Sequence, residues 1–143
     1  MGSEMCIRDR VNTPQAERIV HRLTDWLLVQ CAGARVVDAY CGVGTIALPL
    51  AKAGFDVQGL ELNPDSVEQA RLNAMHNGLS SRCAFNAGDV ADLLAAQLDD
   101  CQALVLDPPR RGLDRRVVDS ILCLLYTSPS PRDLSTSRMP SSA

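Results

Sequence analysis

Residues 35–53, RVVDAYCGVGTIALPLAKA, decide the fold. A short apolar run leads into Asp38, then a glycine turn at Gly42 and Gly44, and then an apolar helical pattern from Thr45, which is typical of a strand, a tight turn and a helix. Glycines accept backbone angles that other residues avoid, and they let a ligand approach the main chain. The helix behind them offers unpaired N–H groups and a positive dipole end. The stretch therefore predicts a nucleotide-type cofactor at the first strand-to-helix turn of an α/β sheet.

The composition is that of one soluble globular domain at most, with 143 residues, of which 46% are hydrophobic and 22% charged. The net charge of -3 argues against a strongly basic nucleic-acid coat, so any RNA contact would rest on a local patch. No apolar run approaches the roughly eighteen residues that a membrane span needs. The six cysteines are scattered, without a C-x-x-C pair or paired histidines. This pattern indicates reduced thiols in a cytoplasmic protein and neither a disulfide framework nor a metal site.

Both ends of the chain look foreign to the domain. Residues 126–143 are mostly Ser, Thr and Pro, with too little apolar content to offset the cost of ordering. The opening MGSEMCIRDR has no periodicity and no signal-peptide hydrophobic segment. The stretches CIRDR and CLLYTSPSPRD resemble translated sequencing-adaptor sequence. We therefore expect a foreign or disordered leader at 1–10, a functional domain at 11–122 and a foreign, disordered tail at 123–143.

Strand and helix patterns alternate along the domain. A first helix is expected from Thr13 and Pro14 to about residue 30, with an apolar face that includes Ile19 and Trp26. Four strands and four helices then follow in turn, at 35–39, 45–52, 55–60, 64–76, 82–85, 90–98, 103–106 and from Asp114 to about residue 122. The strands are apolar on both faces, which predicts a doubly wound, mostly parallel α/β sheet of the Rossmann-like type. We expect this sheet to be incomplete at its C-terminal strands.

Acidic residues follow successive strands of this sheet. Glu61, Asp89 and Asp107 each come directly after a strand or its turn, and Asp38 precedes the first glycine turn. Because ligands of doubly wound sheets lie beyond the carboxyl ends of the strands, these positions predict one shared site.

The glycine turn by itself leaves two cofactor classes open. Gly42-x-Gly44-x-x-Ala47 followed by Glu61 nearly matches the dinucleotide fingerprint, so an NAD-dependent oxidoreductase is one alternative. Asp38 occupies a strand position that normally stays apolar in NAD-binding proteins. A carboxylate at that position favours a ligand that carries an ammonium group.

Four segments, DAYCGVGTIALPLA, GLELNPDSVEQARLNAMHNGL, AGDV and LVLDPPRRGL, resemble the S-adenosylmethionine core of the RNA uracil-C5 methyltransferases that act on tRNA and 23S rRNA. The similarity covers about residues 11–122, and DPPR followed by Gly-Leu is its most family-specific part. The resemblance implies a class I methyltransferase fold, S-adenosyl-L-methionine as cofactor and RNA as partner, with rRNA favoured over tRNA. The sequence does not fix the oligomeric state, and we expect a monomer.

Carried over by position, the resemblance implies that residues at the strand ends bind the cofactor, namely Asp38, Tyr40, Gly42, Gly44, Thr45, Glu61, Asp89 and Asp107. Tyr40 and the glycine backbone would line the methionine and ribose portions, with Thr45 beside the methionyl group. Glu61 would hold the ribose hydroxyls and Asp89 the adenine edge. Asp107 would lie between the cofactor and the target base.

The catalytic residues of the family have no counterpart in this sequence. In the family a cysteine thiolate adds to uracil C6, the activated C5 takes the methyl group, and a glutamate removes the proton. The cysteine belongs to a Ser-Cys-Asn-Pro segment after the fifth strand, where this sequence reads CLLYTSPSPRD. We therefore expect no activity of this chain alone, and we expect Cys41 and Cys123 to be small packing residues. A family glutamine that contacts the cofactor would fall at Arg10, in the expected leader.

A dense basic patch follows Asp107 and consists of Arg110, Arg111, Arg115 and Arg116. Phosphate contacts by these residues would fit RNA binding. The alternative is a solvated helix start whose arginines pair with Asp114 and Asp119. A third functional class is a non-catalytic binding module or an unstable fragment, because its fourth strand would keep an open edge.

Overall fold

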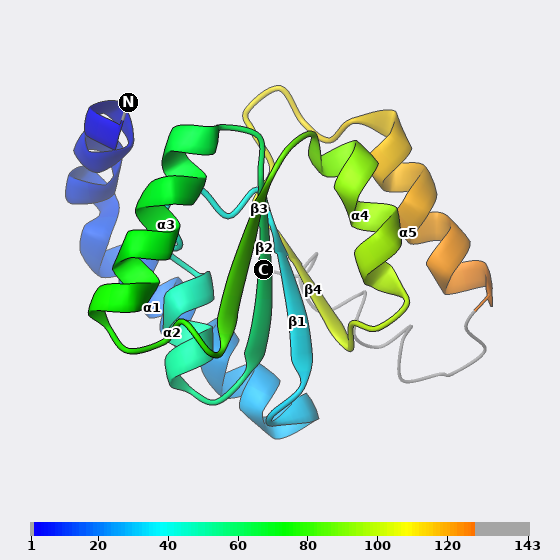
Figure 1. Ribbon diagram of the computed structural model, residues 1–143, viewed down its shortest axis with the longest axis horizontal. Coiled ribbons are helices and arrows are strands. Elements are labelled where there is room, and N and C mark those ends of the chain that lie inside the picture. The colour runs from blue at the N-terminus through cyan, green and yellow to red at the C-terminus, as the bar shows by residue number, and fades with distance from the viewer. Residues whose placement is uncertain (1, 128–143) are drawn as a thin grey trace.

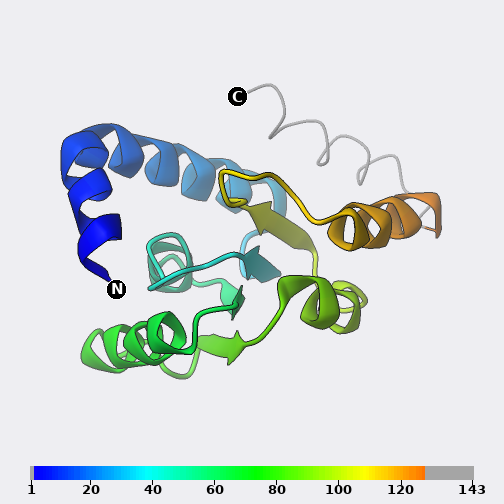
Figure 2. The ribbon, with the colours of Figure 1, turned by 90° about the horizontal axis from the view of Figure 1, so that it is seen from above.

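Four short strands with apolar side chains on both faces pair into one parallel sheet. The computed structural model describes the backbone of residues 2–127 and the side chains of residues 14–123. The strand order is β3-β2-β1-β4, with β1 at Arg35–Ala39, β2 at Asp56–Glu61, β3 at Cys83–Ala87 and β4 at Ala103–Leu106. The helices are α1 Gly2–Cys31, α2 Ala47–Lys52, α3 Pro64–His76, α4 Val90–Leu98 and α5 Arg115–Thr127. Helices cover both faces of the sheet, so the predicted doubly wound fold is confirmed (Figures 1 and 2).

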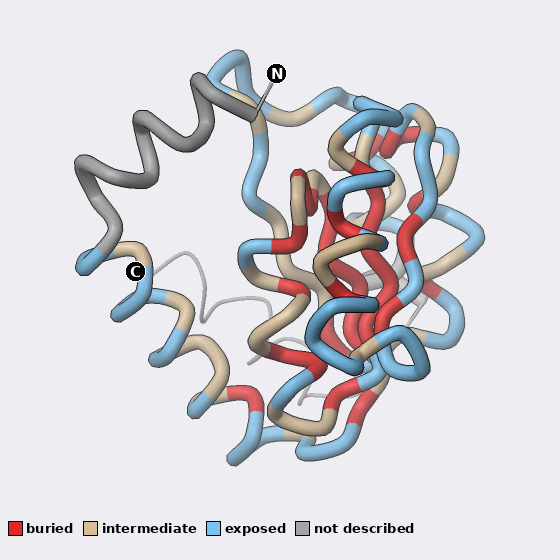
Figure 3. The backbone as a smooth tube through the Cα atoms, turned by 60° about the vertical axis from the view of Figure 1, so that its left-hand side comes forward, coloured by how far each residue is buried: buried red, intermediate tan, exposed pale blue. Residues whose placement is uncertain are grey.

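The sheet separates two apolar layers. Successive side chains of a strand point to opposite faces, so Val36 and Val37 of β1 belong to different layers. Val36 packs in the layer formed with α1, α2 and α3, and Val37 packs in the layer formed with α4 and α5. Buried residues are concentrated on the strands and on the helix faces turned toward them (Figure 3). Each fully buried Leu or Val contributes roughly 1.5–3 kcal/mol relative to an exposed one, which makes these two layers the main stabilising feature.

The pairing register aligns the ends of three strands. In β1, Ala39 lies opposite Leu60 of β2 and Leu106 of β4. The next residues along these three strands are Tyr40, Glu61 and Asp107, which therefore emerge at the same edge of the sheet. None of the helices in the described part of the chain has the length and apolarity that crossing a membrane would need.

The first helix begins earlier than expected. The predicted start at Thr13 is wrong, because α1 begins at Gly2 and contains Pro14 in its interior. A proline inside a helix removes one N–H and crowds the preceding turn, so it kinks the helix instead of starting it. Figure 2 shows that α1 is bent toward its N-terminal end. Of the predicted apolar face, Trp26 packs against the core, but Ile19 is 62% exposed.

Four predicted elements, at 35–39, 64–76, 90–98 and 103–106, have the bounds that the structure shows, and the others differ by small shifts toward the C-terminus. The second helix begins at Ala47 and not at Thr45, because Gly44 has a φ of 96° and residues 42–46 form turns. Strand β3 continues past the apolar residues to Ala87, since its backbone pairs with Glu61 of β2. Helix α5 continues to Thr127, beyond the expected end near residue 122. Residue 1, the side chains of the expected leader and the tail residues 128–143 lie outside the described residues. The assignments of a foreign leader and a foreign tail therefore stay predictions.

Replacing Gly59 of β2 with alanine should destabilise the fold. A Cβ at this position would meet Phe85 Cδ1 at 2.6 Å and Cys41 Sγ at 2.8 Å. Such overpacking typically lowers the free energy of unfolding by about 1–3 kcal/mol, which urea denaturation would measure. In a Phe85→Val background the same Gly59→Ala change should cost clearly less, because the ring atoms that it meets are gone. An equal cost in both backgrounds would contradict this packing.

Candidate cofactor site

The turn after β1 is fixed by left-handed backbone at three positions. Gly42 and Gly44 have φ values of 57° and 96°, which glycine adopts without strain. Tyr40 has a φ of 63° and is the only non-glycine residue of the described chain in this region. Such backbone costs of order 1–3 kcal/mol for a residue with a side chain and is concentrated at functional sites. The strain at Tyr40 turns the chain out of the sheet, so that the glycine backbone lies at the strand ends.

Glu61 ties this turn to the end of β2. One carboxylate oxygen, Oε1, accepts a hydrogen bond from the Gly42 N–H at 3.0 Å, and Oε2 accepts one from the Asn63 N–H at 3.0 Å. Asn63 in turn caps α3, because its side chain accepts from the Asp65 N–H at 2.9 Å. A carboxylate offers about four acceptor sites, so Glu61 keeps capacity for further donors such as hydroxyl groups.

Asp38 is a buried carboxyl group without a partner. It has 0% exposure, and neither carboxyl oxygen has a hydrogen-bond partner in the described structure. Its pKa is raised from 3.8 to about 8, mainly by burial and further by the charges of Asp107 and Glu61. The backbone N–H of Ala47 opposes the rise without reaching hydrogen-bond geometry. An unpaired buried charge is costly, so this position fits a cationic group of a ligand.

The acidic residues at the ends of β1, β2 and β4 lie together. Glu61 and Asp107 act on the same Asp38 carboxyl group from the two strands that flank β1. Asp107 itself is exposed. The structure thus brings Asp38, Glu61 and Asp107 to one place, as the strand-end pattern predicts.

Tyr40 and Asp89 lie on the side of this site that faces α4 and α5. Asp89 is the N-cap of α4, since its Oδ1 accepts from the Ala91 N–H at 3.0 Å. Tyr40 packs in the apolar layer of these helices. Burial raises the pKa of the Tyr40 hydroxyl, and the nearby charges of Asp114 and Asp89 raise it further. Thr45 is exposed in the turn before α2, and its side chain makes no hydrogen bond within the described residues.

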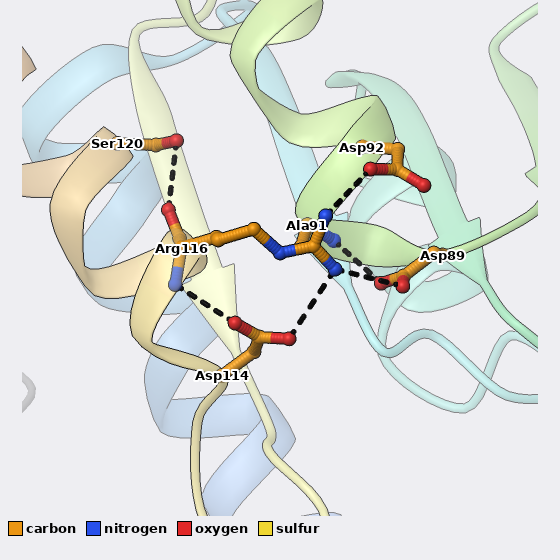
Figure 4. Close-up of polar contacts among 6 residues, drawn as sticks. All are labelled: Asp89, Ala91, Asp92, Asp114, Arg116 and Ser120. Carbon is orange, nitrogen blue, oxygen red and sulfur yellow. Dashed lines mark hydrogen bonds and ion pairs between the residues drawn. The ribbon is translucent and has the colours of Figure 1, made fainter.

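The four arginines of the basic patch divide into two kinds. Arg116 forms ion pairs with three carboxylates, those of Asp89, Asp92 and Asp114 (Figure 4). The predicted pairing with Asp114 is therefore confirmed for Arg116, whereas Asp119 pairs with none of these arginines in the described structure. The other three are exposed and make no side-chain hydrogen bond or ion pair to described residues, namely Arg110, Arg111 and Arg115.

Cys41, the cysteine of the glycine turn, is not suited to act as a nucleophile in this site. Burial, together with the charges of Asp38 and Glu61, raises the pKa of the Cys41 thiol, and the thiolate is the reactive form. Cys41 instead packs against β2, which confirms its expected role. The same expectation is wrong for Cys123, which is exposed because the inward face of α5 carries Val117 and Ile121. The described residues also contain no cluster of His, Cys, Asp and Glu that could hold a metal ion.

Two contacts that support the site were not found from the sequence. Asn73 of α3 donates from Nδ2 to the Val43 carbonyl at 3.1 Å and so holds the glycine turn from behind. Asn73 lies three residues after the buried Ala70, on the inward face of α3. A polar residue on an otherwise apolar helix face is the sequence signal by which this contact could have been found. The second contact is the triple pairing of Arg116. A separate groove, lined by Arg71, Met75 and Phe85, lies between α3 and β3, and none of the predicted cofactor-binding residues lines it.

Comparisons with known proteins agree with this geometry. The methyltransferase domain family matches residues 31–124. An uncharacterized RNA methyltransferase of Parasynechococcus marenigrum is 58% identical over 113 residues, which cover 79% of this chain and 24% of that protein. The 23S rRNA (uracil(747)-C(5))-methyltransferase of Pyrococcus horikoshii is 41% identical over 105 residues, covering 71% of this chain and 24% of that protein.

The solved structure of Pyrococcus abyssi tRNA (uracil-54, C5)-methyltransferase in complex with S-adenosyl-L-homocysteine superposes with a TM-score of 0.64 at 30% identity. It covers 75% of this chain and 25% of that protein, so the chain spans about a quarter of the length of these relatives. S-adenosyl-L-methionine, the cofactor predicted from the sequence, is the one that a methyltransferase domain implies. The chain therefore belongs to the methyltransferase domain family, and RNA uracil-C5 methyltransferases are among its relatives.

Proposed function

We propose that the chain binds S-adenosyl-L-methionine across the carboxyl ends of its strands, as the cofactor-binding part of an RNA uracil-C5 methyltransferase. The observation that carries the proposal is Asp38, a buried and unpartnered carboxyl group beside the glycine turn. When bound, the cofactor supplies an activated methyl group, and its methionine portion carries an ammonium group. A cationic ligand relieves the unfavourable burial of Asp38, whereas the pyrophosphate of NAD brings further negative charge toward the three neighbouring carboxyl groups.

We assign the remaining roles from the position of each residue and from the hydrogen-bonding capacity that its contacts within the protein leave unused. Glu61 accepts from the ribose hydroxyls through the acceptor sites that Gly42 and Asn63 leave open. Asp89 accepts from the adenine amino group. The glycine backbone, Tyr40 and Thr45 surround the methionine and ribose portions, and Asp107 lies toward the target base.

None of the described residues is proposed as the nucleophile of the reaction. The Cys41 thiol is buried, and its raised pKa keeps it protonated. This chain binds the cofactor, and we propose that alone it does not transfer a methyl group to RNA.

RNA is the proposed partner because the relatives are named as RNA methyltransferases. We propose 23S rRNA as the substrate, as in the name of the Pyrococcus horikoshii relative, with tRNA as the alternative that the Pyrococcus abyssi structure represents. This function agrees with the cytoplasmic location that the cysteine pattern predicts.

Calorimetry with S-adenosyl-L-homocysteine tests the proposed cofactor site. The 143-residue chain should bind this ligand, and Glu61→Gln should weaken binding by about tenfold to a hundredfold, because a hydrogen bond to a charged acceptor contributes about 1.5–3 kcal/mol. Glu68→Gln, the same change at an exposed position of α3, should leave the affinity unchanged.

Two outcomes would favour the alternative functions. Stronger binding of NADH than of S-adenosyl-L-homocysteine would favour an oxidoreductase. Rapid hydrogen exchange along residues 103–106, with no binding of either ligand, would favour an unstable fragment.

The stability of the ligand-free protein should depend on pH through Asp38. Its pKa is about 8 in the folded state against 3.8 ordinarily, so between these values the folded protein keeps a proton that the unfolded chain has lost. The free energy of unfolding should therefore fall as pH rises from about 4 to about 8, by roughly 1.4 kcal/mol per pH unit for this group. Asp38→Asn cannot ionise and should lack this dependence in urea denaturation at several pH values. The same pH dependence in both proteins would contradict the burial of Asp38.

The salt dependence of RNA binding should differ between variants of the unpaired arginines and a variant of the ion-paired Arg116. Substituting Arg110, Arg111 or Arg115 with alanine should each reduce the slope of log affinity against log salt by about 0.7–0.9, because each free guanidinium can neutralise one phosphate. Arg116→Ala should change this slope less, since that guanidinium already pairs with three carboxylates. Filter binding with a uridine-containing RNA hairpin at several salt concentrations measures the slopes. A larger change for Arg116 than for the other three would contradict the assignment.

A further inference from the structure

Arg116 joins the segments that follow β3 and β4, the two strands at opposite edges of the sheet. It lies in the first turn of α5, after the loop that begins at Asp107, and its guanidinium reaches the start of α4 (Figure 4). Nη1 donates to Asp92 Oδ1 at 2.9 Å, and Nη2 donates to Asp89 Oδ2 at 3.0 Å and to Asp114 Oδ2 at 3.4 Å. Asp114 also caps α5 through its Oδ1, which accepts from the Arg116 N–H at 2.8 Å. One side chain therefore connects the start of α4, which follows β3, to the segment after β4.

Asp89 is held at both of its carboxylate oxygens. Oδ1 accepts from the Ala91 N–H at 3.0 Å, and Oδ2 accepts from Arg116. Two bonds in different directions fix the plane of a carboxylate, whereas the cap bond alone leaves the group free to rotate about its side-chain torsions. The rotational state of Asp89 in the folded protein thus depends on Arg116.

The exposure of this pair argues against a mainly stabilising role. The side chains of Arg116 and Asp89 are 56% and 47% exposed. Ion pairs at this exposure are well solvated and contribute little to the free energy of unfolding. An exposed ion pair can still orient the Asp89 carboxylate, because the orientation depends on the directions of the hydrogen bonds and not on burial.

We propose that Arg116 is a positioning residue, which fixes the Asp89 carboxylate so that it accepts from the adenine amino group and thereby sets the preference for adenine over other purines. This inference rests on the proposed function, in which Asp89 contacts the adenine. It also removes Arg116 from the set of RNA-binding residues, since its donors are used within the protein.

The test compares two ligands that differ at one position of the base. S-inosyl-L-homocysteine carries a carbonyl oxygen where S-adenosyl-L-homocysteine carries the amino group, so at this position it presents an acceptor, which the Asp89 carboxylate repels, in place of a donor. Calorimetry on the 143-residue chain should show that the unchanged protein prefers the adenosyl ligand by roughly tenfold or more. Arg116→Ala should reduce this preference to roughly threefold or less. Arg116→Lys should retain part of it, because an ammonium group can pair with Asp89 but lacks the guanidinium fork.

Asp92→Ala is the matched control within the same cluster. It removes one partner of Arg116 and leaves the bond to Asp89 in place, so the preference should stay that of the unchanged protein. An equal loss of preference in this variant would assign the effect to the charge of the cluster and overturn the proposal.

A lower melting temperature of Arg116→Ala with an unchanged preference would show a structural role only and would also overturn it. If Arg116→Ala does not fold, Arg116→Lys decides, and a preference equal to that of the unchanged protein counts against positioning. Failure of the unchanged protein to bind either ligand would instead reject the proposed function, and with it this inference. Binding of the adenosyl ligand with an intact preference in every variant rejects the inference alone.

Discussion

The parallel pairing of β1 with both β2 and β4 is the constraint on which the site depends. This register places Asp38 opposite Gly59 on one side and Val105 on the other. It also brings Glu61 and Asp107 out on either side of the turn that follows β1. A slip of one residue would exchange the faces of a strand and would turn Asp38 toward the opposite layer. The hydrogen bond from the Gly42 N–H to Glu61 then fixes the turn against the end of β2.

Features that weaken the fold are concentrated at this edge of the sheet. Asp38 is buried without a partner, and Tyr40 has left-handed backbone. Both are unfavourable in the ligand-free protein, and they persist because the apolar layers on the two faces of the sheet outweigh them. Most of the chain buries apolar groups and keeps ordinary backbone angles, and these two exceptions lie at the site. Such exceptions are expected where ligand binding, and not stability, determined the residues.

Much of the fold could be predicted because its signals are local. The cap of α3 at Asn63 and the end of this helix at Asn77 and Gly78 are fixed by residues next to each other in the chain. The four strands follow from short apolar runs, and their carboxyl ends follow from the parallel arrangement. The shared location of Asp38, Glu61 and Asp107 is therefore a consequence of the fold class.

The remaining features depend on contacts that no local pattern encodes. Arg116 pairs with Asp89 and Asp92, which lie more than twenty positions earlier in the sequence. The sequence alone therefore could not separate Arg116 from the unpaired arginines of the basic patch. The helical start at Thr13 was favoured by Pro14, which is compatible both with a helix start and with a kink. The glycine fingerprint fits two cofactor classes, and only the burial of Asp38 without a partner separates them on physical grounds.

The most direct measurement is the map of amide chemical-shift changes in the ¹⁵N-labelled chain as S-adenosyl-L-homocysteine is added. A cofactor across the strand ends predicts the largest changes at Gly42, Gly44, Asn63 and Ala91, whose N–H groups lie in the turn or bond to Glu61 and Asp89. Changes confined to the groove between α3 and β3, or no changes in a folded protein, would contradict the account.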